Sequence, residues 1–266
     1  TLTAILTMIS FPGTIIKRKE HDMNDHITQL VRLIRDAGQI TFFGGAGVST
    51  ESGIPDFRSA QGLYRQKRVI PPETILSHSF FIRDPESFYA FYRENLLTPN
   101  ARPNQAHLAL ARLEALGKLR CVVTQNIDNL HQEAGSSRVC ELHGSTKRNY
   151  CMKCEKPYPL DKLPGPPGLP YCDCGGLIRP DVVLYEEGLD QAVISTAIAH
   201  IQNSDLLIVG GTSLNVYPAA GFVRLCPGKL VIINRDPTPY DHYADLVIHD
   251  SIGQTLSDAL RLLEQP

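Results

Sequence analysis

Residues 40–58 read Ile-Thr-Phe-Phe-Gly-Gly-Ala-Gly-Val-Ser-Thr-Glu-Ser-Gly-Ile-Pro-Asp-Phe-Arg, and this stretch decides the fold. Its apolar start, residues 40–43, is typical of a buried strand. Three glycines within the next four residues allow the backbone to turn sharply and to approach a ligand closely. Because free N–H groups at the start of a helix favour anions, we expect this loop to be suited to a pyrophosphate group.

The glycine-rich loop differs from the two common phosphate-binding motifs. Thr50 stands where the dinucleotide motif G-x-G-x-x-G has its last glycine, and no acid follows about 20 residues later for a ribose. No Gly-Lys-Ser/Thr motif is present either. The loop alone therefore leaves two interpretations open, a nucleotide site and a tight strand–helix turn without a ligand. Asp56, Phe57 and Arg58 add a carboxylate, an aromatic ring and a cation that a plain phosphate site does not require.

Outward from this loop, short apolar segments alternate with helical patterns. Strands are expected at 40–43, 121–124, 181–185, 206–209, 230–233 and 245–248. Helices are expected at 25–37, 86–92, 104–116, 190–202 and 253–263. The alternation predicts an α/β fold with a Rossmann-like parallel sheet and helices on both of its faces.

Composition further divides the chain into a large domain and a smaller lobe. The Rossmann-like domain is predicted over residues 23–58, 101–146 and 179–266. The smaller lobe combines a helical insert at 59–100, rich in aromatic residues, with a cysteine-bearing module at 147–178. That module is poor in hydrophobic residues, so we expect a bound metal to stabilise it.

The first 22 residues are apolar at their start, but they lack a preceding basic region and an evident cleavage site. We expect residues 1–22 to form a poorly ordered extension, with Met23 as an alternative start and a targeting peptide as the alternative interpretation.

Charge and cysteine content limit the classes of partner and compartment. The 266-residue chain has a formal net charge of −2, so no overall field draws it to nucleic acid or to an anionic membrane. No apolar run approaches the length of a membrane span. Seven cysteines, an odd number with four of them clustered, favour a metal site in a reducing compartment over a disulfide framework. We therefore expect a cytoplasmic protein that binds neither nucleic acid directly nor a membrane.

The four clustered cysteines form two short pairs. Cys151-x-x-Cys154 and Cys172-x-Cys174 are separated by 17 residues, a spacing typical of tetrahedral zinc coordination. With four protein ligands no position stays open for water, so the predicted zinc is structural.

Polar side chains follow several of the expected strands. Gln125, Asn126 and Asp128 come directly after the strand at 121–124. In open α/β sheets ligands bind beyond the carboxyl ends of the strands, although Asn and Asp are also common helix N-caps. The segment 210–219 and Asn234 likewise follow strands and suit phosphate or ribose contacts.

His143 stands before a glycine at the boundary between the two parts of the chain. Its ordinary pKa lies near neutral pH, as a general base requires, and a purely structural histidine is the alternative.

Taken together, these motifs resemble those of the sirtuin family, and the sequence as a whole is most similar to bacterial sirtuins. The matching motifs are Gly44–Arg58, Thr124–Asp128, Leu142-His143-Gly144, the four cysteines, Arg179–Val183 and Gly211–Ala219. They follow the order in which the family has them.

The resemblance implies an NAD-dependent protein lysine deacetylase that yields nicotinamide, O-acetyl-ADP-ribose and deacetylated lysine. It implies His143 as the base that activates a ribose hydroxyl, with Asn126 orienting the ribose and Asp128 holding the nicotinamide carboxamide. It also implies that acetylated proteins bind as an extended strand between residues 182–189 and 213–217. The NAD contacts that it implies are Gly44, Ala46, Gly47, Thr50, Asp56, Phe57, Arg58, Gln125, Asn126, Asp128, Gly211, Thr212, Ser213 and Asn234.

Three departures from the family pattern bear on the zinc site and on substrate choice. The second cysteine pair is one residue shorter than the usual C-x-x-C, and Tyr185-Glu186-Glu187 stands where the family has F-G-E. Sirtuins that prefer succinyl groups carry Tyr-x-x-Arg, but here Tyr92 is followed at that spacing by Asn95. We therefore predict a preference for uncharged acyl groups, acetyl first.

Two other functions remain open from the sequence. A sirtuin-like protein ADP-ribosyltransferase would share the cleavage of NAD, and a non-enzymatic module would bind NAD without turnover. Retention of His143 favours deacetylation.

Overall fold

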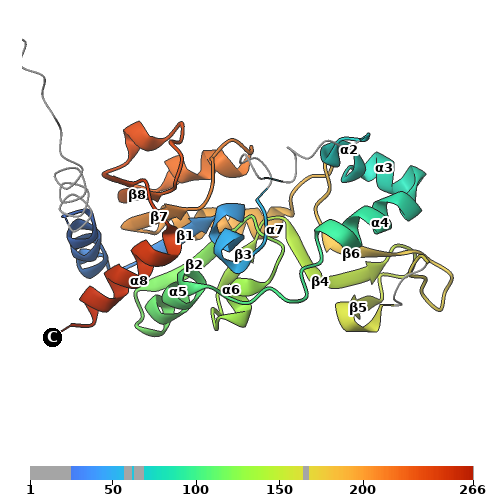
Figure 1. Ribbon diagram of the computed structural model, residues 1–266, viewed down its shortest axis with the longest axis horizontal. Helices are drawn as coiled ribbons and strands as arrows, with labels where there is room; N and C mark the ends of the chain where they lie inside the picture. Colours follow the sequence, from blue (N-terminus) through green and yellow to red (C-terminus); the bar gives the residue numbers. More distant parts are fainter. Residues whose placement is uncertain (1–24, 57–61, 63–68, 164–167, 266) are drawn as a thin grey trace, which may run out of the picture.

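The computed structural model describes residues 25–56, 62, 69–163 and 168–265, and they form two lobes side by side (Figure 1). The larger lobe is built on a six-stranded sheet in the order β3-β2-β1-β7-β8-β9, with every neighbouring pair parallel. The smaller lobe contains a three-stranded sheet in the order β5-β4-β6. The expectation for residues 1–22 and part of the expected helical insert lie outside the described residues.

The larger lobe has the predicted α/β architecture. Its strands are β1 (Ile40–Gly44), β2 (Leu119–Thr124), β3 (Val139–Glu141), β7 (Leu206–Gly210), β8 (Lys229–Ile233) and β9 (Leu246–Ile248). Its α-helices are residues 25–36, α5 (Gln105–Ala115), α6 (Leu130–Glu133), α7 (Gln191–Gln202) and α8 (Ile252–Leu263). Shorter 3-10 helices are η1 (Ala46–Ser52), η4 (Ala219–Leu225) and η5 (Asp241–Tyr243).

Successive residues of β1 enter two different cores, which shows that helices cover both faces of the sheet. Phe42 packs with residues of the 25–36 helix, α5 and α8, whereas Phe43 packs with α7 and η4. Side chains alternate across a strand, so both faces of a central strand must be apolar when helices lie on each side. Both phenylalanines are fully buried.

Five of the six expected strands are confirmed in the large sheet, and two details differ. The sequence did not predict β3, which is only three residues long and lies at the edge of the sheet. The prediction of a strand at 181–185 in the large sheet was wrong, both in its bounds and in the sheet to which the strand belongs. The strand runs over Ile178–Val182 as β6 and pairs antiparallel with β4 (Gly144–Cys151) in the smaller lobe.

Contact with the backbone of β6 explains why β4 begins with a glycine. Gly144 has a φ of 74°, and a Cβ atom there would overlap the carbonyl group of Asp181. The close approach lets β4 and β6 pair directly after His143, so the polypeptide passes from one lobe to the other at this point.

The smaller lobe has an aromatic core of its own. Its elements are α2 (Pro72–Ile75), α3 (His78–Arg83), α4 (Pro85–Asn95), β4, β5 (Pro157–Pro159), η3 (Leu160–Lys162) and β6. Phe81, Phe88, Tyr89 and Tyr92 are buried together against Leu184. The helical pattern expected around residues 86–92 is confirmed as α4.

Within the described part of the chain, no helix combines the length and the apolar character that crossing a membrane would need.

Candidate active site

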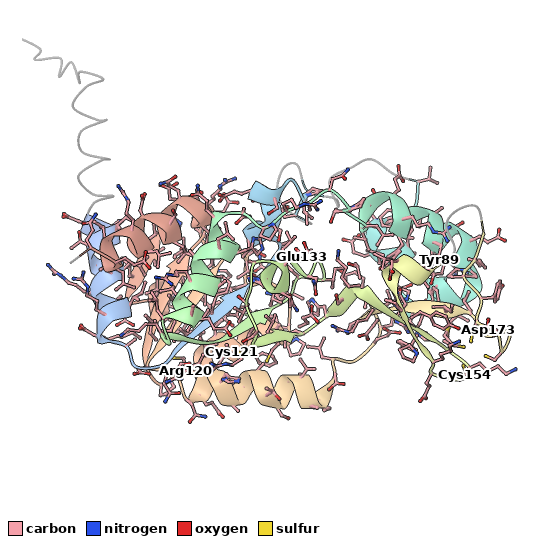
Figure 2. All side chains as sticks on the ribbon, turned by 90° about the horizontal axis from the view of Figure 1, so that it is seen from below. Tyr89, Arg120, Cys121, Glu133, Cys154 and Asp173 are labelled. Atoms are coloured by element: carbon pink, nitrogen blue, oxygen red, sulfur yellow. The ribbon has the colours of Figure 1, made fainter. Side chains whose placement is uncertain are left out.

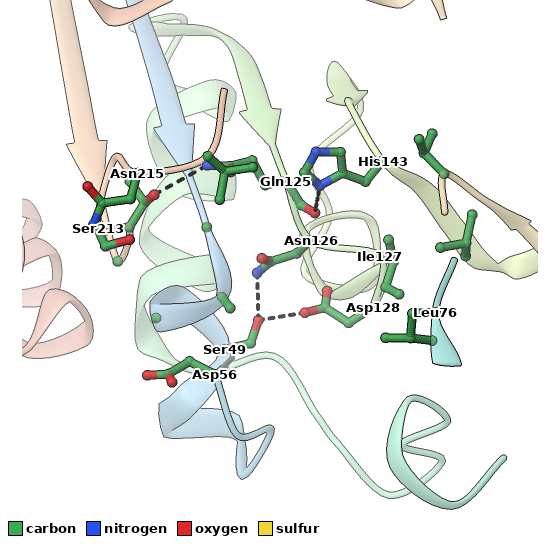
Figure 3. Close-up of a pocket in the computed structure, with 18 of the residues that line it drawn as sticks. Ser49, Asp56, Leu76, Gln125, Asn126, Ile127, Asp128, His143, Ser213 and Asn215 are labelled. Carbon is green, nitrogen blue, oxygen red and sulfur yellow. Dashed lines mark hydrogen bonds between the residues drawn. The ribbon is translucent and has the colours of Figure 1, made fainter. Parts of the chain in front are cut away.

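A cavity of about 910 Å³ lies at the carboxyl ends of the central strands and reaches the smaller lobe (Figure 3). Its volume falls in the range of small-molecule sites. The segments that line it are the loop after β1, residues 125–128, His143, residues 182–189, residues 211–213 and 215–218, and Asn234, Asp236 and Pro237. The strand ends that the sequence analysis singled out therefore meet at one place.

Contact between two loops explains the glycines after β1. The Gly47 amide donates a 2.8 Å hydrogen bond to the Gly211 carbonyl oxygen, and a Cβ atom on Gly47 would lie 2.7 Å from that oxygen. Gly211 itself has a φ of 57°, in the left-handed region. Any side chain at Gly47 would push apart the loops that follow β1 and β7, so both glycines shape the floor of the cavity.

Ser49 joins the glycine-rich loop to the polar segment after β2. Its hydroxyl donates to an Asp128 carboxylate oxygen at 2.6 Å and accepts from the Asn126 side-chain amide at 3.1 Å (Figure 3). Ser49 and Asn126 are buried, and the Asn126 backbone amide donates to the Thr124 hydroxyl at 3.0 Å. The three side chains are therefore held in fixed positions at the cavity wall.

His143 lies on the opposite side of the same segment. Its Nδ1 is 2.9 Å from the carbonyl oxygen of Gln125, and an Nδ1–H proton donates there (Figure 3). The neutral ring then carries a lone pair on Nε2. Burial lowers the pKa of His143 below its ordinary 6.5, while the hydrogen bond to Gln125 opposes this in part. The ring is therefore neutral at neutral pH and able to accept a proton.

Most of the predicted ligand-binding residues line the cavity. The Gln125 side chain also donates to the Thr212 hydroxyl at 3.3 Å, which ties the segment after β2 to the loop after β7. The predicted residues that line the cavity are Ala46, Gly47, Asp56, Gln125, Asn126, Asp128, His143, Gly211, Thr212, Ser213 and Asn234.

Two predicted residues of the described chain do not line the cavity, and one residue that does line it was missed. Gly44 is the last residue of β1, and the Thr50 hydroxyl donates to the Gly47 carbonyl oxygen at 2.9 Å. Phe57 and Arg58 lie outside the described residues. Ser49 was not singled out from the sequence, although it stands in the glycine-rich motif beside Thr50.

The four clustered cysteines meet at the far end of the smaller lobe, where Figure 2 labels Cys154. Their sulfur atoms all lie within 4.8 Å of one another. The Sγ atoms of Cys151 and Cys174 are 3.5 Å apart, and those of Cys154 and Cys172 are 3.6 Å apart. Zn–S bonds of about 2.3 Å in a tetrahedron place sulfur atoms about 3.8 Å apart, so the thiols fit a zinc ion despite the shortened second pair.

The chain resembles known proteins over most of its length. A sequence model described as the Sir2 family matches residues 45–218. An NAD-dependent protein deacetylase of Clostridium perfringens is 55% identical over 243 residues, covering 90% of this chain and 100% of that protein. Another of Clostridium acetobutylicum is 54% identical over 241 residues, covering 89% of this chain and 98% of the relative.

Solved structures agree with the sequence relatives. A Sir2–p53 peptide–NAD+ structure superposes with a TM-score of 0.79 at 39% identity, covering 90% of this chain and 97% of the other. A complex of a Sir2 homologue with NAD superposes with a TM-score of 0.81 at 38% identity, covering 89% of this chain and 93% of the other.

Proposed function

The chain belongs to the Sir2 family and is an NAD-dependent protein deacetylase, and on that premise we propose roles for its residues. The observation that carries the proposal is the position of His143. Its unprotonated Nε2 belongs to a ring that lines the same cavity as Asn126 and Asp128. A neutral base beside fixed polar groups is what activation of a ribose hydroxyl requires.

NAD, when bound, supplies the ADP-ribose that accepts the acetyl group and nicotinamide as the leaving group. The glycine-rich loop and the loop after β7 would lie against its phosphates, because both approach the cavity without side chains at Gly47 and Gly211. The amides of these two glycines are themselves bonded within the protein, to the Gly211 and Ile233 carbonyl oxygens. Asn126 and Asp128, both bonded to Ser49, would orient the ribose and the nicotinamide carboxamide.

His143 would act as the general base of the step that follows loss of nicotinamide. Its Nδ1–H bond to the Gln125 carbonyl fixes the tautomer and the orientation of the ring. Burial keeps the ring neutral, so it can take a proton from a bound hydroxyl at neutral pH.

The acetylated substrate would add as an extended strand between residues 182–189 and 213–217. On the first segment, the backbone N–H and carbonyl of Tyr185 are bonded to Leu76 and His78 of the smaller lobe. A peptide strand would therefore pair with other residues of this segment, not with Tyr185. Both segments line the cavity, so the acetyl-lysine side chain of such a strand would point toward His143.

Four thiolate ligands would hold a structural zinc ion and stabilise the end of the smaller lobe. We propose a reducing compartment, the cytoplasm, as the location, because there the thiols stay reduced and available to the metal.

Mass spectrometry of the products formed from NAD and an acetyl-lysine peptide tests the function. O-acetyl-ADP-ribose with deacetylated peptide supports it. ADP-ribosylated protein without deacetylation would instead support the related ADP-ribosyltransferase reaction. NAD binding without any turnover would support a binding module.

A further inference from the structure

We infer that Glu186 makes this enzyme select acetyl-lysines that have a basic residue beside them in the peptide. The inference rests on the strand mode of peptide binding proposed above. The proposed peptide site between residues 182–189 and 213–217 is called the groove below. An acetylated lysine is neutral, so a charge at this groove can act only on the peptide residues that flank the acetyl-lysine. Glu186 lies directly after Tyr185 on the segment proposed to border the peptide, and it lines the cavity.

Glu186 holds an exposed carboxylate in a fixed position. Its oxygens accept from the Ser79 backbone amide at 2.9 Å and from the Ser79 hydroxyl at 3.0 Å. Both donors are neutral, so they order the carboxylate without cancelling its charge. A group that is already ordered loses less entropy when it binds a partner, which makes it a better recognition element than a mobile one.

The conformation of Glu186 is unusual for its residue type. Its φ of 76° lies in the left-handed region, which favours glycine. The sequence also departs from the family motif F-G-E at this position, where glycine is the family residue. A charged side chain thus replaces a residue without one at the rim of the groove.

The adjacent acid, Glu187, has a different role from Glu186. Glu187 makes two hydrogen bonds with Arg179, at 2.6 and 3.0 Å, and one of 2.7 Å with His78. Its charge is compensated inside the smaller lobe. No lysine or arginine pairs with Glu186 among the residues that the structure describes, so no cation of this part of the chain compensates its charge at the cavity.

The surroundings of Glu186 would strengthen the attraction for a cation. Within the described ranges, Asp128 and Asp236 also line the cavity, and no lysine or arginine lines it. Tyr217, on the second segment that borders the groove, is 69% exposed. Its ring offers a face on which an arginine side chain can stack.

The test compares acetyl-lysine peptides that differ at a single flanking position. Positions −2, −1, +1 and +2 each carry Arg, Gln or Glu, and kcat/KM is measured at saturating NAD. An exposed ion pair changes binding by about two- to fivefold. The wild type should therefore favour Arg over Gln by about this factor at one position or more, and disfavour Glu similarly. The Arg advantage should shrink between about 50 mM and about 500 mM salt.

Three variants assign the preference to Glu186. Glu186→Gln keeps the shape and removes the charge, so the Arg-to-Glu ratio should fall toward unity. Ser79→Ala keeps the charge but frees the carboxylate, so the ratio should be intermediate. Glu86→Gln removes an exposed acid of α4 that does not line the cavity, and it should leave the ratio unchanged.

Equal kcat/KM for the Arg and Glu peptides at all four positions overturns the inference, and so does a ratio that survives in Glu186→Gln. Peptides with single N-methylated backbone amides test the strand mode separately. If no N-methylation raises KM, the strand mode is rejected, whatever the charge preference. Absence of turnover with every peptide would reject the proposed function itself.

Discussion

Ser49 donates a 2.6 Å hydrogen bond to Asp128, a residue 79 positions away, and this bond joins the first glycine-rich loop to the segment after β2. The same hydroxyl accepts from Asn126. Two side chains proposed to contact NAD therefore share one buried hydroxyl as a partner.

Replacing Ser49 by Ala should weaken the use of NAD by about 10- to 100-fold in kcat/KM. The change removes both hydrogen bonds at once, and loss of a bond to a charged group costs about 1.5–3 kcal/mol. Steady-state kinetics with NAD as the varied substrate measure the effect. Thr50→Ala is the neighbouring control, because that hydroxyl bonds to Gly47 and does not line the cavity. Equal losses in both variants would contradict the assignment.

The difference between Ser49 and Thr50 also marks the limit of what the sequence reveals about the site. The segments after the strands line one cavity, as expected for parallel strands that end at one edge of the sheet. Which of two adjacent hydroxyls faces that edge depends on the turn of η1. Ser49 is 1% exposed and bonded to Asp128, whereas Thr50 turns back to its own loop.

The same limit applies to the fold. Apolar runs predicted β1, β2, β7, β8 and β9, since central strands covered on both faces are apolar throughout. A run of apolar residues does not reveal its pairing partner, so β6 was assigned to the wrong sheet. The edge strand β3 is three residues long and only partly buried, so it leaves no such pattern.

His143→Ala should reduce kcat by at least about 100-fold while NAD still binds, because a general base contributes about 10²–10⁴-fold. In the wild type, activity should rise with pH as His143 loses its proton. Burial lowers that pKa below 6.5, so the acidic limb should lie below pH 6.5 and the rate should be level at neutral pH. Rate profiles and NAD titrations measure both effects. An unchanged acidic limb in the residual activity of His143→Ala would contradict the role.

Cys154→Ser should lower the zinc content below about one ion per chain and destabilise the smaller lobe, because it removes one of four ligands. Metal analysis and thermal unfolding measure the two effects. Cys226→Ser is the matched control, since Cys226 is half-buried and lies outside the cluster. Full zinc content in Cys154→Ser would exclude Cys154 as a ligand.

Butyryl-lysine should be deacylated at least about tenfold faster than succinyl-lysine, although the two acyl groups have four carbons each. The reason is charge, because no lysine or arginine lines the cavity in the part of the chain that is described. The guanidinium group of Arg93 bonds instead to the Gly168 carbonyl, at 2.8 Å, and lies over the Tyr89 ring. An unpaired carboxylate in the acyl pocket is costly. Competition assays with the two peptides measure the ratio, and faster desuccinylation would contradict the prediction.

Glu187→Gln should destabilise the protein by about 1–3 kcal/mol at pH 7, allowing for solvent screening, because it leaves Arg179 without its partner. Burial acts to raise the pKa of Glu187, but hydrogen bonds from Arg179, the Leu184 amide and His78 outweigh it and hold that pKa at about 2. The carboxylate therefore contributes its full stability above the ordinary pKa of 4.5 and loses it as the pH falls toward 2. Urea unfolding at several pH values should show the gap between wild type and variant narrowing across this window. Glu86→Gln, the control, should unfold with the same free energy as the wild type at every pH. If the difference in unfolding free energy between wild type and Glu187→Gln does not depend on pH, the ion pair with Arg179 is not its source.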